Sequence, residues 1–234
     1  MAEVLPIVLI PGLLCSARMY EPQIPALWRR GPVMVADHTR SDSMAGIAAD
    51  ILAAAPPRFA LAGLSMGGYI AFEILRQAPE RVARLALLDT QARPDTPEQS
   101  ERRRLQIELA SKGRLLEVAD LQFPLMISEP RHGDAGLRAL NRQMANDVGP
   151  EAFARQQRAI IGRPDSRSDL AAIRCPTLVL VGAQDALTPP DRAEEMAAAI
   201  GGARLAVIED SGHLSTVEQP EAVTAALVGW LEAG

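Results

Sequence analysis

Short runs of consecutive apolar residues recur along the chain. Six of these runs predict strands, at residues 4–10 (with the strand itself starting near Ile7, after Pro6), 32–36, 59–63, 82–88, 177–182 and 204–209. A continuous apolar run, unlike an alternating one, is typical of a strand that is covered on both faces. We therefore expect an α/β fold with a mostly parallel central sheet of about six strands.

Helical stretches separate most of these runs. The capping residues and the spacing of apolar positions predict helices at residues 43–54, 65–77, 189–200 and 216–231. Alternation of strand and helix favours a doubly wound sheet with right-handed crossovers, in which helices cover both faces.

The alternation stops between residues 94 and 169, which contain no good strand candidate. Helical runs are expected there at residues 98–109, 113–121, 136–144 and 150–161. We divide the chain into a core of residues 1–93 and 170–234 and a helical cap or lid of residues 94–169, inserted after the fourth strand. An ordinary helical layer of the same domain is the alternative, but the length of the insertion favours a lid over a site at the strand ends.

Composition removes several classes of protein. The 234 residues carry 24 basic and 29 acidic side chains, a net charge of −5, which does not suit binding to nucleic acid or to an anionic membrane. The two cysteines form no disulfide framework, and no Cys/His cluster has the spacing of a metal site. No apolar run approaches the roughly 18 residues of a membrane span, and residues 1–10, with Glu3 and no basic segment, do not resemble a signal peptide. We expect a cytoplasmic monomer or homodimer acting on a small molecule.

The strongest local motif is the Gly63-Leu64-Ser65-Met66-Gly67 sequence, placed between an expected strand and an expected helix. A G-x-S-x-G motif in that context forms a tight turn that exposes the serine hydroxyl above the sheet. The glycines remove side chains that would collide with the turn. A glycine-rich turn by chance is the alternative, and the flanking elements make it the weaker one.

A serine hydroxyl needs a base, and the base needs an acidic group to orient it. Of the three histidines, His213 follows the sixth strand and suits the role, whereas His132 and His38 are expected at the surface. Asp185 follows the fifth strand and is the favoured acid, because it lies between the serine and the histidine in sequence. Asp89, after the fourth strand, is its competitor, and Asp210 lies too near the histidine.

Oxyanion stabilisation requires two N–H donors. The N–H of Met66 begins the helix after the serine, and the Pro11-Gly12 turn after the first strand frees the N–H of Leu13 to face the same point. Further expected pocket residues are Leu14, Phe123, Leu125 and Met126, although the last three serve equally well as the internal core of the insertion.

Taken together, the segments LIPGLL (9–14), GLSMGG (63–68), TLVLVGAQD (177–185) and SGHLSTVEQP (211–220) resemble the α/β-hydrolase fold family over nearly the whole chain outside the insertion. The resemblance implies a nucleophilic Ser65, a base at His213, an orienting Asp185, an oxyanion hole from Leu13 and Met66, and no cofactor. Pro11-Gly12 replaces the family's frequent His-Gly pair, which implies altered support of this loop. Two leading antiparallel strands of fuller members look absent, as in members similar to the menaquinone-pathway synthase and plant methyl-esterases.

These features predict a serine hydrolase that cleaves a carboxylic ester, lactone or thioester through an acyl-enzyme on Ser65. The same three residues would also serve a C–C bond hydrolase or an acyltransferase. A non-catalytic small-molecule receptor of the same fold is the alternative of a different class, and the intact set of serine, histidine and aspartate argues against it.

Overall fold

The fold class predicted from the apolar runs is confirmed. The structure, a computed structural model, describes residues 4–233, so residues 1–3 of the segment compared with a signal peptide, and residue 234 at the end of the expected core, lie outside the described residues. Six parallel strands form one sheet in the order β2-β1-β3-β4-β5-β6. Their bounds are β1 (Ile7–Ile10), β2 (Val33–Val35), β3 (Phe59–Leu64), β4 (Val82–Leu88), β5 (Thr177–Gly182) and β6 (Arg204–Ile208).

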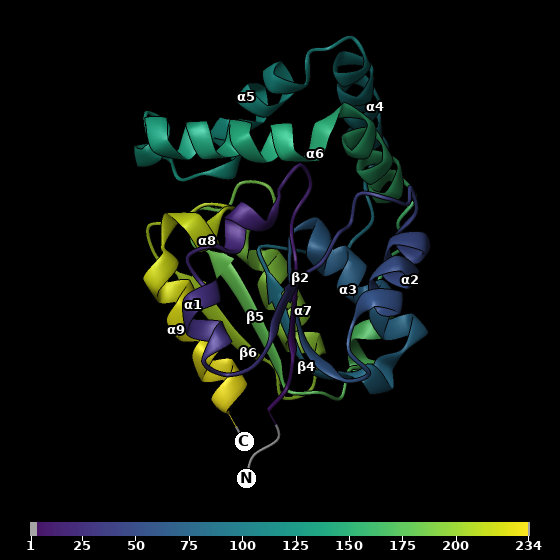
Figure 1. Ribbon diagram of the computed structural model, residues 1–234, viewed down its shortest axis with the longest axis vertical. Coiled ribbons are helices and arrows are strands. Elements are labelled where there is room, and N and C mark those ends of the chain that lie inside the picture. The colour runs from purple at the N-terminus through teal and green to yellow at the C-terminus, as the bar shows by residue number, and fades with distance from the viewer. Residues whose placement is uncertain (1–3, 234) are drawn as a thin grey trace.

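Helices cover both faces of this sheet, with α1 (Ile24–Trp28) and α9 (Pro220–Glu232) on one face and α2 (Met44–Ala54), α3 (Met66–Gln77) and α7 (Pro190–Ala199) on the other (Figure 1). Alternate residues of each strand feed the two cores: Val8 and Ile10 pack toward α2 and α3, whereas Ile7 and Leu9 pack toward α1 and α9. Burial on both faces explains why the strands are continuously apolar in the sequence.

The long segment between β4 and β5 forms three helices at the carboxyl ends of the strands (Figure 1). We call this group the helical insertion: α4 (Pro97–Ser111), α5 (Leu115–Met126) and α6 (Ala135–Ile161). Helix α6 is broken at Gly149, which has φ 76° directly before Pro150. That break is where the sequence predicts the boundary between two separate helices.

The helical insertion is hydrogen-bonded to the core at two separate points, one in α6 and one between α5 and α6. In α6, Arg155 Nε donates to the carbonyl oxygen of Thr39 at 2.7 Å. Beyond α5, the buried carboxylate of Glu218 accepts the backbone N–H of Ser128 at 2.8 Å and that of Gly212 at 2.9 Å. The second contact matters for the site, because Gly212 immediately precedes His213.

Some elements differ from the sequence prediction. The expected helix over residues 216–231 is two helices, α8 (Ser215–Glu218) and α9, because Pro220 cannot donate the backbone hydrogen bond that would continue α8. Helix α1 was not predicted, and neither were the short 3₁₀ segments at Ala17–Tyr20, Pro79–Arg81, Glu129–Arg131 and Arg167–Ala172.

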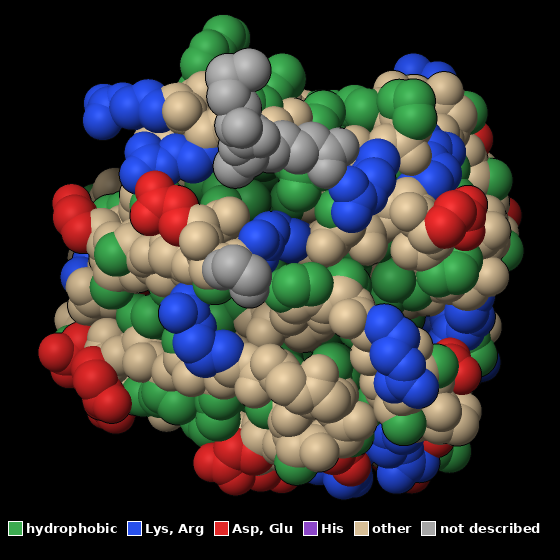
Figure 2. All heavy atoms as spheres, turned by 90° about the horizontal axis from the view of Figure 1, so that it is seen from below, with side chains coloured by type: hydrophobic (Ala, Val, Ile, Leu, Met, Phe, Trp, Pro, Cys, Tyr) green, Lys and Arg blue, Asp and Glu red, His purple; other side chains and the backbone are tan. Residues whose placement is uncertain are grey.

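The face opposite the helical insertion shows basic, acidic and hydrophobic side chains interspersed over its surface (Figure 2). Within residues 4–233, no helix combines the length and apolarity needed to cross a membrane.

Candidate active site

Ser65 stands at the turn between β3 and α3 with φ 54° and ψ −113°, a backbone conformation that L-residues rarely adopt. Hydrogen bonds on both sides hold it there: its N–H donates to the carbonyl oxygen of Leu88 at 2.9 Å, and its own carbonyl accepts the Thr90 hydroxyl at 2.7 Å. Backbone strain of this kind persists only where surrounding contacts impose it, and it is concentrated at functional sites.

The two glycines of the motif allow this turn to sit tightly in the fold. A Cβ at Gly63 would lie 2.3 Å from the carbonyl oxygen of Gly67, and a Cβ at Gly67 would lie 2.2 Å from that of Ile10. Real Cβ atoms essentially never approach so closely, so only glycine fits at either position. The same close packing sets the first turn of α3 beside the end of β1.

Asp185 and His213 form a buried pair at the same edge of the sheet. His213 Nδ1 donates to Asp185 Oδ2 at 2.8 Å, and the imidazole is 3 % exposed. The carboxylate is held by three further donors: the N–H groups of Leu187 and Thr188 bind Oδ1 at 2.8 and 2.9 Å, and the Thr188 hydroxyl binds Oδ2 at 2.7 Å. Because the proton on Nδ1 points at the carboxylate, the tautomer leaves Nε2 as an acceptor.

The charges around this pair favour a protonatable imidazole. Burial of the ring opposes its positive charge, but the carboxylate of Asp185 raises the pKa of His213 above its usual value. Burial likewise opposes the negative charge of Asp185, and the imidazole together with the Thr188 donors brings the pKa of that carboxyl below its usual value. The arrangement stabilises an imidazolium formed after proton uptake.

Asp89, the competing acid, makes no hydrogen bond to the imidazole among the described residues. Its Oδ1 accepts the N–H of Gly182 at 2.8 Å, and its Oδ2 is paired with the hydroxyl of Ser215. Complete burial and the nearby charge of Asp185 raise the pKa of Asp89 to about 8, so this carboxyl is mostly protonated at neutral pH. A neutral carboxyl bonded elsewhere does not orient the histidine.

The loop after β1 brings a second set of backbone donors to Ser65. Gly12 lies against the serine, since a Cβ there would be 3.4 Å from Ser65 Cβ, and Leu14 has φ 58°. Among the described residues, no acceptor binds the N–H of Leu13, and the N–H of Met66 at the first position of α3 has no partner within the helix. Both expected oxyanion donors are therefore available.

This loop is held by two residues that sequence reasoning did not assign to it. Gln156 Oε1 of α6 accepts the N–H of Leu14 at 3.1 Å, and His38 Nε2 lies 3.0 Å from the carbonyl oxygen of Gly12. The expectation that His38 is a surface residue is wrong, because it is 3 % exposed and burial lowers its pKa. The sequence did contain a clue to this role: His38 lies shortly after β2, and β2 is the neighbour of β1, the strand that leads into the loop.

Ser65 and His213 line one cavity of about 270 Å³ between the sheet edge and the helical insertion, together with Leu13 and Thr188. No hydrogen bond between Ser65 and His213 occurs in the described chain, and such contacts often form only once substrate is bound. Leu125 and Met126 also line the cavity. Leu14 and Phe123, which we expected there, do not: Leu14 packs into the core of the helical insertion, and Phe123 is fully buried between the helical insertion and the sheet.

Sequence comparison identifies the family. The profile of the alpha/beta hydrolase family matches residues 7–226, almost the whole chain. This chain belongs to the alpha/beta hydrolase family. It is an enzyme of the hydrolase type, and the fold and the positions of the six strands agree with that assignment.

Several proteins similar to this hydrolase are named as esterases or lactonases. A thermophilic esterase from Thermogutta terrifontis, solved with malate bound, is 36% identical with a TM-score of 0.89, covering 97% of this chain and 89% of that one. An enol-lactonase from Burkholderia xenovorans LB400 is 26% identical with a TM-score of 0.89, covering 99% and 93%. The pimeloyl-(acyl-carrier protein) methyl ester esterase of Nitrosomonas europaea is 27% identical over 186 residues, which cover 77% of this chain and 73% of that one.

A second potential nucleophile of the hydrolase, Cys15, lines the same cavity. It is completely buried, and burial raises the pKa of its thiol to about 12. Since the thiolate is the reactive form of cysteine, this side chain is inert near neutral pH.

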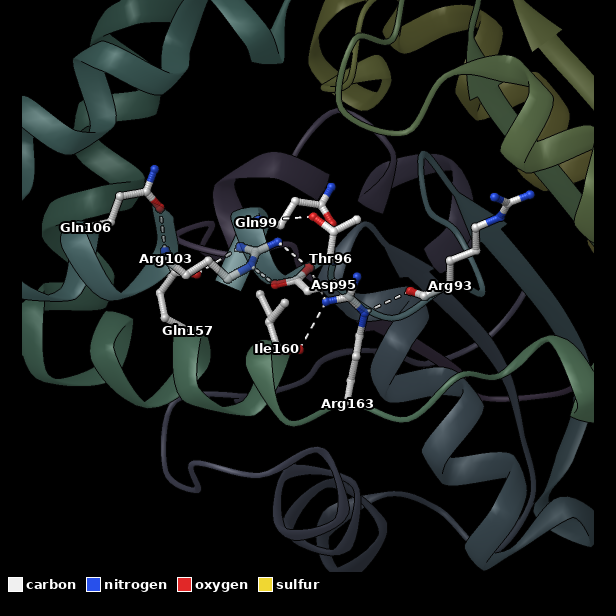
Figure 3. A network of polar contacts seen from close by, with 9 residues as sticks. All are labelled: Arg93, Asp95, Thr96, Gln99, Arg103, Gln106, Gln157, Ile160 and Arg163. Atoms are coloured by element: carbon white, nitrogen blue, oxygen red, sulfur yellow. Dashed lines mark hydrogen bonds and ion pairs between the residues drawn. The ribbon is translucent and has the colours of Figure 1, made fainter. Parts of the chain in front are cut away.

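The cavity wall formed by α4 is polar. Gln99, Arg102, Arg103 and Gln106 all line it. Arg103 belongs to a network with Asp95 and Gln157 (Figure 3). Among residues 4–233, no three histidine, cysteine or acidic side chains converge as ligands for a metal ion.

Proposed function

We propose that this protein is a serine hydrolase that cleaves a carboxylic ester or lactone of a small molecule through an acyl-enzyme on Ser65. The observation that carries the proposal is the buried Asp185–His213 hydrogen bond, 2.8 Å long, at the cavity that also exposes the strained Ser65. The ester and lactone chemistry named for the Thermogutta terrifontis and Burkholderia xenovorans proteins supports this class of substrate.

The acylation step follows from the protonation states. Nε2 of His213 removes the proton of the Ser65 hydroxyl while Oγ forms a bond to the substrate carbonyl carbon. Asp185 keeps the other ring proton on Nδ1 and stabilises the resulting imidazolium. The tetrahedral intermediate then collapses, and the bond between the former carbonyl carbon and the oxygen of the leaving alcohol breaks. The imidazolium gives its proton to that oxygen.

Deacylation repeats these steps with water in place of Ser65. The imidazole removes a proton from water, the hydroxide attacks the acyl carbon, and the carboxylic acid leaves as Ser65 regains its proton. In both halves the negative charge on the carbonyl oxygen is met by the N–H groups of Leu13 and Met66, and Met66 adds the positive end of the α3 dipole. Removing one such donor typically costs about 10²- to 10³-fold in rate.

Two measurements test the proposal together. Purified wild-type protein should release p-nitrophenol from short p-nitrophenyl esters, and a fluorophosphonate probe should attach to Ser65 as located by peptide mass spectrometry. Ser65→Ala should abolish both signals. Ser211→Ala is a suitable control, because Ser211 is a buried serine of the histidine loop that does not line the cavity.

Either of two results would overturn the proposal. Turnover of esters that persists in Ser65→Ala would show that another group is the nucleophile. Absence of both turnover and probe labelling in folded wild-type protein, over a panel of esters, lactones and thioesters, would favour the receptor reading.

A further inference from the structure

The α4 wall of the cavity presents hydrogen-bond donors and positive charge. Two arginines line the cavity, Arg102 and Arg103, and none of its lining residues is an aspartate or glutamate. Arg103 is paired with Asp95 outside the lining, whereas no acidic side chain among residues 4–233 pairs with Arg102, so a cavity lined in this way attracts a negatively charged ligand.

One buried carboxylate forms ion pairs with two guanidinium groups next to this wall. Asp95, whose side chain is 1 % exposed, binds Arg103 at 2.6 Å and Arg163 at 2.7 Å (Figure 3). Arg163 also lies over the ring of Tyr69, a cavity residue, at 4.2 Å, and its Nη2 is buried without a hydrogen-bond partner. The cluster of Asp95, Arg103 and Arg163 therefore keeps one positive charge beyond what Asp95 neutralises.

Hydrogen bonding inside the network fixes the direction of two glutamine amides. The N–H of Thr96 can only donate, so it orients Gln99 Oε1 toward itself at 2.9 Å. In the same way, Arg103 binds Gln157 Oε1 at 2.9 Å, and Gln157 Nε2 then donates to Gln106 Oε1 at 2.7 Å.

The oxygens of Gln99 and Gln106 are consequently hydrogen-bonded within the protein, whereas Gln91 and Gln122, which also line the cavity, lie outside this network. The nitrogens of Gln99 and Gln106 have no acceptor among the described residues, and Figure 3 shows them directed away from the network. What these two side chains chiefly offer a ligand is an N–H donor, because each oxygen already accepts a hydrogen bond inside the protein. The network thus presents N–H donors on this wall, which suit a ligand group that accepts hydrogen bonds.

Arg102 is the group of this wall that is free to bind. Within residues 4–233 no acidic side chain pairs with it, whereas Arg104, two positions further along the same exposed helix, is paired with Glu101 at 3.0 Å and does not line the cavity. A guanidinium fork bounded by amide N–H groups matches the two oxygens of a carboxylate.

We propose that the substrate carries a carboxylate in addition to the bond that is cleaved, and that Arg102, Gln99 and Gln106 bind this carboxylate while Ser65 attacks. The proposal rests on the proposed function and names its substrate class. Arg103 takes part by orienting Gln157 and hence Gln106.

The test compares substrates that differ only in this charge. Monomethyl adipate and methyl hexanoate have the same chain length and the same scissile ester, and one ends in a carboxylate where the other ends in a methyl group. Methanol release gives kcat and KM for both in wild type, Arg102→Gln and Arg104→Gln. The monomethyl esters from succinate to suberate then locate the best chain length.

We expect wild type to prefer an anionic ester of this series over its neutral counterpart. Arg102→Gln should raise KM for the anionic ester about tenfold, the effect of losing a charge-assisted hydrogen bond at a partly exposed site, and should change KM for methyl hexanoate much less. Arg104→Gln makes the same change in net charge on the same helix and should alter neither. Added salt should weaken the preference.

Equal KM values of wild type for the charged and neutral esters, or equal losses in Arg102→Gln and Arg104→Gln, would overturn the carboxylate site and leave the serine hydrolase intact. Calorimetric titration of Ser65→Ala with monomethyl adipate tests the carboxylate site by binding alone, independently of turnover. Binding that disappears in the Ser65→Ala, Arg102→Gln double variant supports the carboxylate site even where turnover is absent. No binding to Ser65→Ala, with turnover of neutral esters intact in wild type, counts against it.

Discussion

Replacement of Asp185 by asparagine tests which acid orients the histidine. Asp185 Oδ1 accepts two backbone N–H groups, from Leu187 and Thr188, so the amide oxygen of an asparagine must occupy that side. Its NH₂ group then faces His213 Nδ1 in place of Oδ2, which now accepts from the imidazole at 2.8 Å. An NH₂ group can only donate, so Nδ1 must lose its proton and Nε2 must carry one.

An imidazole in that tautomer cannot accept the Ser65 proton. We therefore expect Asp185→Asn to lower kcat by about 10³- to 10⁴-fold, as loss of the correct tautomer does in serine hydrolysis generally, which corresponds to about 4 to 5.5 kcal/mol in activation free energy. The measurements are steady-state hydrolysis of a p-nitrophenyl ester and the rate of fluorophosphonate labelling. Both report on the nucleophile, and circular dichroism checks that the variant folds.

Asp89→Asn is the matched control. Asparagine reproduces the protonated carboxyl, because its oxygen can accept from Gly182 and its NH₂ can donate to Ser215. Asparagine also tolerates the φ of 44° at this position. We expect kcat to stay within about threefold of wild type, since this change leaves the Asp185–His213 bond in place. A larger loss in Asp89→Asn than in Asp185→Asn would refute the assignment.

Three further predictions concern stability and the loop after β1. The pKa of Asp89 is raised from 3.8 to about 8 in the folded protein, so between about pH 4 and pH 8 the folded state binds one proton more than the unfolded state. The free energy of unfolding therefore falls as pH rises through that range. Asp89→Asn should flatten the dependence of Tm on pH there. Gly212→Ala should destabilise the fold by about 1–3 kcal/mol in urea unfolding, because its Cβ would lie 2.6 Å from backbone, whereas Gly201→Ala, with open space around it, should not. Gln156→Leu should lower kcat about tenfold, with KM little changed, because it leaves the N–H of Leu14 without an acceptor. Gln156→Glu keeps an acceptor oxygen and should restore most of the activity. An unaltered kcat in Gln156→Leu would contradict this role.

The strands and the edge of the sheet that carries the site were readable from the sequence because burial on both faces leaves a continuous apolar run. Val82–Leu88 and Thr177–Gly182 are such runs, and both strands lie at the predicted positions. The positions of Ser65, Asp185 and His213 follow from this, since each lies in the connection that follows a strand and parallel strands end at the same edge.

Other features depend on tertiary contacts that no local pattern encodes. His38 and Gln156 are 118 residues apart, and they meet at the loop after β1 only because α6 folds back over the sheet. The break of the last helix at Pro220 was visible in the sequence but was outweighed by its apolar periodicity. Phe123 was expected in the pocket because apolar residues suit both a pocket and a core, and only the packing of α5 decides between them.

The hydrogen bonds that attach the helical insertion to the core determine how it can be exchanged for the insertion of a relative. Helices α4 and α5 supply most of the insertion's cavity-lining side chains, and a graft that replaces them could change which molecules are accepted. Any such graft must keep two contacts unchanged. The first is the hydrogen bond from the backbone N–H of Ser128 to Glu218, whose carboxylate also binds the histidine loop at Gly212. The second is the hydrogen bond from the N–H of Leu14 to the side-chain oxygen of Gln156. A chimera that keeps them should inherit working chemistry with a new substrate range.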